Sequence, residues 1–332
     1  MTERIASAAK RPALLSRVTL LLGCAWISAA GAADSYPNRP LRIISPYGAG
    51  GSYDVIARIM AQKLGEQFGQ QVVVDNRPGA TGRIGMELGV KATPDGYTLI
   101  TVGSSQTIAP SVHVSVPYDL SRSIAPIMLF ATITNTLIIH PSIAAQSVSE
   151  FVALAKAKPG SLRYGSGGTG GITHLAGELF NNLAGTNVTH VPYKAGALAS
   201  IALLGNEVQM NILNMLNSLP HIQSGRLRAL AVTGLKRSQY QPALPTLDES
   251  GLKGYAVLEF HSLAFPGGTP QAIVARMNSE LAKALASDDV KQKLSQQAAE
   301  PLITTPAQFG AFLVAEQAKY ARIVKAIGLK PE

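Results

Sequence analysis

Short apolar runs alternate with segments of helical periodicity along most of this chain, and this alternation constrains the fold more than any other feature. In the helical segments apolar residues recur at intervals of three and four positions, as Val55, Ile56, Ile59 and Met60 do. Strands that alternate with helices indicate a parallel sheet with helices on both of its faces. The expected strands are 41–45, 71–74, 97–102, 137–140, 162–166, 188–191, 209–213 and 228–233, and the expected helices between them are 54–68, 84–92, 148–156, 174–184 and 197–204.

The last third of the chain has a different pattern, with three consecutive helices expected over 273–285, 290–298 and 306–326. Their apolar stripe, which includes Phe309 and Tyr320, needs a sheet to cover. Because the run 262–265 could return the chain to the first sheet, we expect an α/β fold of two doubly wound lobes. The expected parts are a first lobe of 34–131 plus 263–332 with the C-terminal helices packed on it, a second lobe of 132–262, and hinge strands near 131–136 and 259–262.

Two glycine-rich turns, at 46–54 and 165–171, each join an expected strand to an expected helix. At such a turn the first amides of the helix and the positive end of its dipole point outward, and glycine lets the backbone approach a ligand closely. Ligands of doubly wound sheets bind beyond the carboxyl ends of the strands. We therefore expect an anion to be bound from two sides, in a cleft between the lobes.

The candidate ligand contacts are amides and hydroxyls of these turns and of neighbouring strand ends. They are Tyr47, Gly50, Gly51, Ser52, Ala80, Thr81, Gly82, Ser104, Ser105, Ser166, Gly167, Gly168, Thr169, Gly170 and His174. Neither turn contains Lys or Arg, so uncharged donors must bind the anion. For several candidates a structural role is the alternative: the glycines could serve tight packing, Tyr47 could pack on the surface, and His174 could hold the strand of His190. Asp54 is expected to stabilise its helix by about 1 kcal/mol as a cap or first-turn residue.

Residues 1–33 are predicted to be a secretory signal, with a basic start, an apolar stretch at 18–27 and a small-residue end cut after Ala32 or Ala33. Lipidation of Cys24, the only cysteine, is the less favoured alternative. Without this segment 25 Lys and Arg stand against 19 Asp and Glu, a net charge of +6 that is scattered along the chain. Such a charge favours acidic small molecules and argues against nucleic acid. An exported chain without disulfides must be stabilised by a large core, and we expect it to be soluble in the periplasm.

A series of motifs in the order of the chain resembles the periplasmic substrate-binding receptors of tripartite tricarboxylate transporters, the Bug or TctC family. The resemblance extends from about residue 36 to about residue 325. Its motifs are 46–54, 76–82 with Gly85, 94–99, 164–171 with His174 and Leu175, 190–194, 220–222, 225–233, 244–247 and 269–270.

The resemblance implies a clamshell of the type II-like periplasmic-binding-protein kind, with the turns at 47–54, 79–82 and 166–170 lining its cleft. It also implies that the chain binds a small organic acid and delivers it to a membrane permease of the tripartite tricarboxylate type. We expect the chain to act as a monomer.

Departures from the family pattern define four further candidate contacts. Asn211 and Asn214 stand where an acidic residue is common, so a ligand ammonium would lack its usual partner and an amino-acid ligand becomes less attractive. His261 stands where an aromatic residue is common and Ala49 where proline is common. We expect these changes to alter the shape of the pocket and not the receptor role.

Two other functions compete with that of a transport receptor. The spacing Gly165-x-Gly167-x-x-Gly170 matches a dinucleotide fingerprint, but the following strand ends in Val191-Pro192 without the required acidic residue. The chain has no G-x-S-x-G, P-loop or H-E-x-x-H motif, and its histidines lack metal-ligand spacing, so we expect no enzyme activity, cofactor or metal. The second alternative is a ligand sensor that presents its metabolite to a signalling partner, which copurification with a membrane partner would separate from transport.

Overall fold

The computed structural model describes residues 36–331. The chain divides into two compact units, Met1–Asn38 and Arg39–Glu332, and the second contains every helix and strand of the described residues. The predicted signal at 1–33, with Cys24 and its cleavage site, lies outside the described residues.

The strands of the second unit form one mixed sheet in the order β2-β1-β3-β9-β4-β7-β5-β6, and β8 and β10 pair with β4 as well. They are β1 (Leu41–Ser45), β2 (Val72–Asn76), β3 (Thr98–Val102), β4 (Ile124–Ile139), β5 (Arg163–Ser166), β6 (Thr189–Pro192), β7 (Met210–Asn214), β8 (Arg228–Val232), β9 (Leu258–Pro266) and β10 (Glu300–Pro301).

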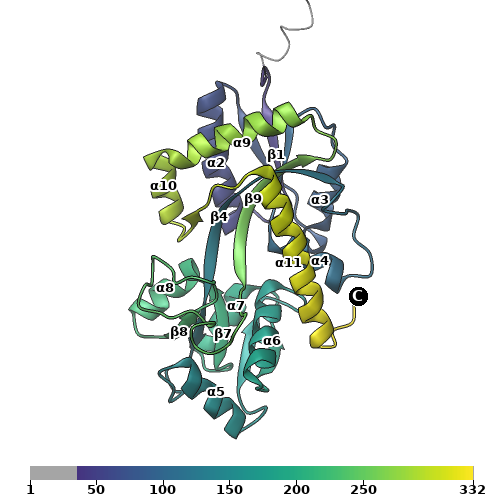
Figure 1. The fold of residues 1–332 in the computed structure, drawn as a ribbon. Coiled ribbons are helices and arrows are strands. Elements are labelled where there is room, and N and C mark those ends of the chain that lie inside the picture. Colours follow the sequence, from purple (N-terminus) through teal and green to yellow (C-terminus); the bar gives the residue numbers. More distant parts are fainter. Residues whose placement is uncertain (1–35, 332) are drawn as a thin grey trace, which may run out of the picture. The chain divides into compact units, whose positions relative to one another are not determined.

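The expectation of a parallel sheet is correct only at the two ends of this order. β1 pairs in parallel with β2 and β3, and β5 pairs in parallel with β6 and β7. In the middle, β9 is antiparallel to β3 and β4, and β4 is antiparallel to β7 and β8. β4 is 16 residues long, and the sequence predicted it only from about residue 131 onward, as a hinge strand near 131–136 and a separate strand at 137–140. One part of β4 pairs with β9 and the next part with β7, so a single strand serves both ends of the sheet (Figure 1).

Helices connect the strands and cover the sheet. They are α2 (Ser52–Phe68), the short 3-10 turn η1 (Ala80–Gly82), α3 (Arg83–Val90), α4 (Ser104–Val112), α5 (Val148–Ala157), α6 (Ile172–Ala184), α7 (Gly196–Leu204), α8 (Met215–Gln223), α9 (Gln271–Ala286), α10 (Asp288–Ser295) and α11 (Pro306–Ala326). Most agree with the predictions to within a few residues. The sequence missed α4 and α8, which contain Pro110 and Pro220, because proline inside a helix removes a hydrogen bond and argues against a helix.

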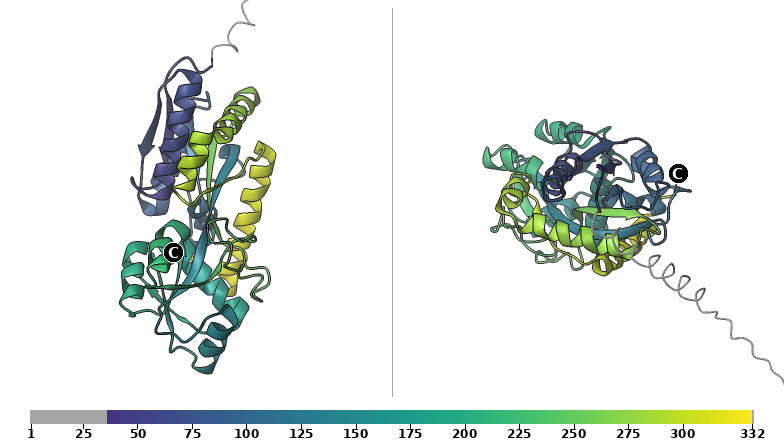
Figure 2. Two further views of the ribbon diagram at one scale, coloured as in Figure 1. Left: turned by 90° about the vertical axis from the view of Figure 1, so that its left-hand side faces the viewer. Right: turned by 90° about the horizontal axis from the view of Figure 1, so that it is seen from above.

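Separate apolar clusters fill the space beside the two ends of the sheet. One gathers Met86, Val102 and Phe309 beside β3, and another gathers Phe151, Phe180 and Met210 beside β7. α11 packs on β4 and α4, as expected for the first predicted lobe. Its C-terminal part also packs on α6 of the second, so this helix contacts elements of both predicted lobes (Figure 2). The lobe boundaries at 131 and 263 stay a prediction.

Candidate functional site

The carboxyl ends of the parallel strands from the two ends of the sheet point toward each other along β4. β3 ends at Val102, which pairs through β9 with Leu129 of β4. β7 runs the opposite way and ends at Asn214, which pairs with Asn135. Six residues of an extended strand separate Leu129 from Asn135, which corresponds to roughly 20 Å. We call the ends of β1 and β3 the first edge and those of β5 and β7 the second edge.

Helices begin at both edges, as the two glycine-rich turns predicted. α2 and α4 start at the first edge after Gly51 and Gly103, and α6 and α8 start at the second edge after Gly171 and Asn214. Helix geometry leaves the first amides of each helix without an intrahelical acceptor, and each start carries the positive end of a helix dipole. The arrangement favours an anion at either edge.

Two stacked tyrosines form a wall of the first edge. The rings of Tyr47 and Tyr53 are 3.7 Å apart and nearly parallel, and a Cβ at Gly103 would overlap both side chains, so this position requires glycine. The Tyr47 hydroxyl donates to Gln106, and the hydroxyl of Tyr53 accepts from the amide of Ser104 at 3.3 Å. Burial raises the pKa of both tyrosines, so they stay neutral donors at physiological pH. Tyr53 was not a predicted site residue.

Asp54 has the structural role expected from the sequence. It accepts hydrogen bonds from the amide of Gly50 and from Asn76, both at 2.9 Å, and forms an ion pair with Arg58. Burial alone would raise the pKa of Asp54, but the bonds from Arg58, Gly50 and Asn76 hold it below its ordinary value. Asp54 thereby occupies the Gly50 amide, and helix geometry leaves the amides of Ser52 and Tyr53 as the available donors of this turn.

The turn at 80–82 has a strained backbone beside a buried donor. Ala80, Thr81 and Gly82 all have positive φ, of 47°, 58° and 87°, which is costly for the two residues with side chains. A Cβ at Gly82 would lie 2.8 Å from Nε2 of Gln106. Gln106 is buried and its Oε1 accepts from Gly103 and Tyr47, whereas its Nε2 has no partner among the described residues. A buried donor of this kind calls for an acceptor at this edge.

The second glycine-rich turn uses most of its amides within itself. Gly167 donates to Thr173, Gly168 donates to Ser166, and Gly170 donates to Nδ1 of His174. In this structure the donors left to a ligand are the amide of the exposed Thr169 and the first amides of α6. Ligand contact through the amides of Gly167, Gly168 and Gly170 stays a prediction that requires these bonds to open.

His174 and Ser166 hold a neighbouring strand. The His174 ring stacks on that of His190 at 4.0 Å, and Ser166 Oγ lies 2.6 Å from Nε2 of His190. Burial and, to a smaller extent, the neighbouring His174 together lower the pKa of His190 to about 4. This geometry matches the structural alternative given for His174.

Two other predicted contacts, Asn211 and Ser104, already form hydrogen bonds within the protein, whereas three more are at least partly exposed. Asn211 is fully buried, and its amide bonds Gly165 at 2.7 Å and Ala199 at 2.8 Å. Ser104 is buried and donates its hydroxyl to Leu258, whereas Ser105, one residue further into α4, is partly exposed. Gly51 and Ala49 are exposed on the first turn.

Glu259 of β9, which was not a predicted site residue, joins the two edges. Its carboxylate accepts from Ser52 Oγ of the first edge and, at 2.9 Å, from Asn214 Nδ2 of the second. Nε2 of His261 lies 3.2 Å from the same carboxylate, and the His261 ring lies 4.5 Å from that of Tyr53. Burial opposes ionisation of Glu259, but His261, Ser52 and Asn214 hold its pKa below the ordinary value. The signal in the sequence was one acidic residue inside the apolar run that begins β9.

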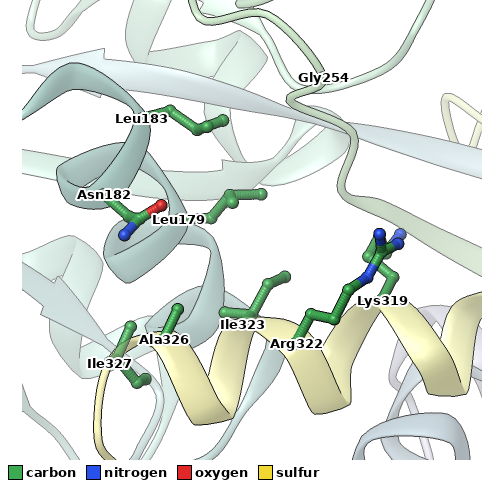
Figure 3. Close-up of a pocket in the computed structure, with 9 residues that line it drawn as sticks. All are labelled: Leu179, Asn182, Leu183, Gly254, Lys319, Arg322, Ile323, Ala326 and Ile327. Carbon is green, nitrogen blue, oxygen red and sulfur yellow. The ribbon is translucent and has the colours of Figure 1, made fainter.

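A separate hollow of about 330 Å³ lies between α6 and α11, away from both edges. Figure 3 shows Lys319 and Arg322 at its rim on α11 and Leu179 and Leu183 on α6. Lys319 is already bound to Glu316 and to the carbonyl of Ala256. None of the predicted ligand contacts lines this hollow.

Between residues 36 and 331, no cluster of three or more His, Cys, Asp or Glu side chains is placed to hold a metal ion. Within the same range, no helix has the length and apolar character needed to cross a membrane.

Residues 56–329 match the family model described as the tripartite tricarboxylate transporter family receptor, TctC. The chain is 35% identical to Protein BugT of Bordetella pertussis over 96% of this chain and 98% of that protein. Among solved structures, Rpa4515 of R. palustris with adipate is 33% identical, with a TM-score of 0.78 over 90% of this chain and 100% of the other. The periplasmic binding protein BugD is 32% identical, with a TM-score of 0.75 over the same shares. The chain therefore belongs to the TctC family, and it is a solute-binding receptor with the α/β fold of that family.

Proposed function

We propose that this receptor binds a small organic carboxylate between the first and second edges, in the periplasm, and delivers it to a membrane permease of the tripartite tricarboxylate type. One observation carries the proposal: four helices begin at two strand edges that point toward each other, so the positive ends of their dipoles face one region. The related Rpa4515 was solved with adipate, a small organic acid, which supports an organic acid as the ligand here.

At the first edge the proposed donors are the amides of Ser52 and Tyr53 and the unpartnered Nε2 of Gln106, with the turn at 80–82 beside it. At the second edge they are the amide of Thr169 and the start of α6. These donors are uncharged, so each contributes modestly and their number provides the affinity. Because each contact is modest, a receptor that binds in this way can also release its ligand to a permease.

Ligand contacts to both edges would stabilise a closed form over an open one, by as much as the ligand's affinities for the two forms differ. The hinge would lie in β4 and β9 near 131–136 and 259–262, where these paired strands pass from the first predicted lobe to the second. We propose that the receptor acts as a monomer, because one chain supplies both edges.

The test is a calorimetric titration of the chain beginning at Asp34 with aliphatic, aromatic, tricarboxylic and amino acids, each paired with its primary amide. The proposal requires at least one acid to bind while its amide does not. Bound acid at a hundredfold excess over its dissociation constant should stabilise the fold by about 2.7 kcal/mol, measured as a raised melting temperature. Equal binding of acid and amide, or binding of neither across the panel, would overturn it.

A further inference from the structure

The region between the two edges already contains a carboxylate, that of Glu259. Its side chain is 14% exposed and lies on β9 between the start of α2 and the start of α8. One acidic group thus receives a hydrogen bond from each edge, as the proposed ligand would.

This carboxylate uses donors that a ligand anion would need. Ser52 and Asn214 were both predicted to contact the ligand, and both donate to Glu259. Oδ1 of Asn214 accepts from the amide of Leu216, so both ends of that side-chain amide are engaged. A second carboxylate could take these donors only by breaking the bonds to Glu259.

Glu259 also gives the region a negative charge. Its pKa is held below the ordinary value, so it is ionised at neutral pH. Across residues 36–331 its ion-pair partner is His261, and no Lys or Arg is paired with it. Two carboxylates near each other in a partly dry site repel strongly, and a plain diacid would therefore be disfavoured here.

A ligand that carries a protonated amine would be favoured for the same reason. An ionised carboxylate has roughly four acceptor positions. Ser52 and His261 lie against Oε1 of Glu259, and Asn214 donates to Oε2. An ammonium group could donate to the remaining position and balance the charge. Its own carboxylate would then bind the amides of the first edge, beyond Ser52.

We propose that Glu259 determines the specificity of this receptor by accepting a hydrogen bond from a protonated amine, so that the ligand is a zwitterionic amino acid and not a plain diacid. This inference rests on the proposed function and names its substrate class. It reverses the expectation drawn from Asn211 and Asn214, because the acidic partner for an ammonium comes from β9 and not from β7.

The experiment compares matched acids in calorimetric titrations: adipate with 2-aminoadipate, and succinate with both aspartate and malate. The wild-type protein should bind the amino member of each pair about tenfold or more tightly than the plain diacid, and aspartate more tightly than malate. Glu259→Gln removes the charge at nearly constant shape and should weaken binding of the amino acids about ten- to hundredfold, with little loss or a gain for the plain diacids. Glu316→Gln, a buried glutamate of α11 beside Lys319, is the control and should leave all affinities unchanged.

The outcomes separate this inference from the proposed function. Preference of the wild-type protein for a plain diacid, preference for malate over aspartate, or an equal loss for both members of a pair in Glu259→Gln would overturn the role of Glu259 while the carboxylate receptor stands. Failure of any acid to bind would overturn both. The wild-type comparison needs no variant, so it decides the inference even if Glu259→Gln does not fold.

Discussion

Asn211 is bound to the strand that leads into the second glycine-rich turn, because its Oδ1 accepts a hydrogen bond from the amide of Gly165 at 2.7 Å. Its Nδ2 donates to the carbonyl of Ala199 at 2.8 Å, so one buried side chain links β7, β5 and α7. Replacement by leucine would leave two buried backbone groups without partners, at a cost of about 1–3 kcal/mol each.

We therefore expect Asn211→Leu to lower the free energy of unfolding by about 2–5 kcal/mol, measured by urea denaturation. Asn182→Leu, on the exposed side of α6, is the control and should change stability by less than about 0.5 kcal/mol. A variant of Asn211 that unfolds like the wild type but no longer binds acids would instead assign this side chain to the ligand.

Gly51 offers a clean test of the first edge. Its φ of −79° suits any residue, and an added Cβ would find its nearest neighbour, Gly48 O, at 3.8 Å. Gly51→Leu should cost about 1 kcal/mol of stability or less but place a bulky side chain over the amides of Ser52 and Tyr53. We expect loss of acid binding in calorimetry, and undiminished affinity would mean that the site lies elsewhere.

Gly168 is not an equivalent position, because its φ is +133°. Gly168→Leu strains the backbone wherever the ligand binds, and should cost about 1–3 kcal/mol. A lower melting temperature is therefore expected for this variant and not for Gly51→Leu. Equal melting of the two would show that the turn at 165–171 relaxes without cost.

Asp54 should make the free energy of unfolding change with pH at pH values below about 4. Its pKa is depressed in the folded chain by Arg58, Gly50 and Asn76, so its contribution is present above the unfolded pKa and is lost as the pH falls through the folded pKa. Asp54→Asn should be less stable than the wild type at pH 6, and the gap should narrow toward pH 2. Denaturation curves at a series of pH values measure the gap, and a constant gap would contradict the assignment.

His190 should also make the free energy of unfolding depend on pH, over a higher pH range than Asp54 does. Because its pKa is lowered to about 4, below the unfolded value, the unfolded chain binds a proton before the folded chain does. Stability should therefore fall as the pH drops from about 6.5 to about 4. His190→Gln lacks this group and should lose less stability over that interval. Parallel curves for the two proteins would show that His190 titrates normally.

The local features of the fold could be predicted from the sequence. α11 was expected at 306–326 and is found there, since its apolar spacing and its Thr305 cap with proline next to it are all short-range signals. β1 was also placed correctly. The extent of β4 could not be predicted, because its long apolar run is compatible with several lengths, and only pairing with β9 on one part and β7 on the next extends it to 16 residues.

For the candidate site, the sequence by itself determined the family motifs, the positions of the glycine-rich turns and the structural role of Asp54, which acts within its own helix turn. Only the tertiary structure decided which donors are free. Ser52 and Glu259 are 207 positions apart, and Gln106 meets Gly82 through a turn of the backbone that no local pattern specifies. The order and register of strands bring such residues together, and hydrogen-bond partners distant in sequence follow from that packing alone.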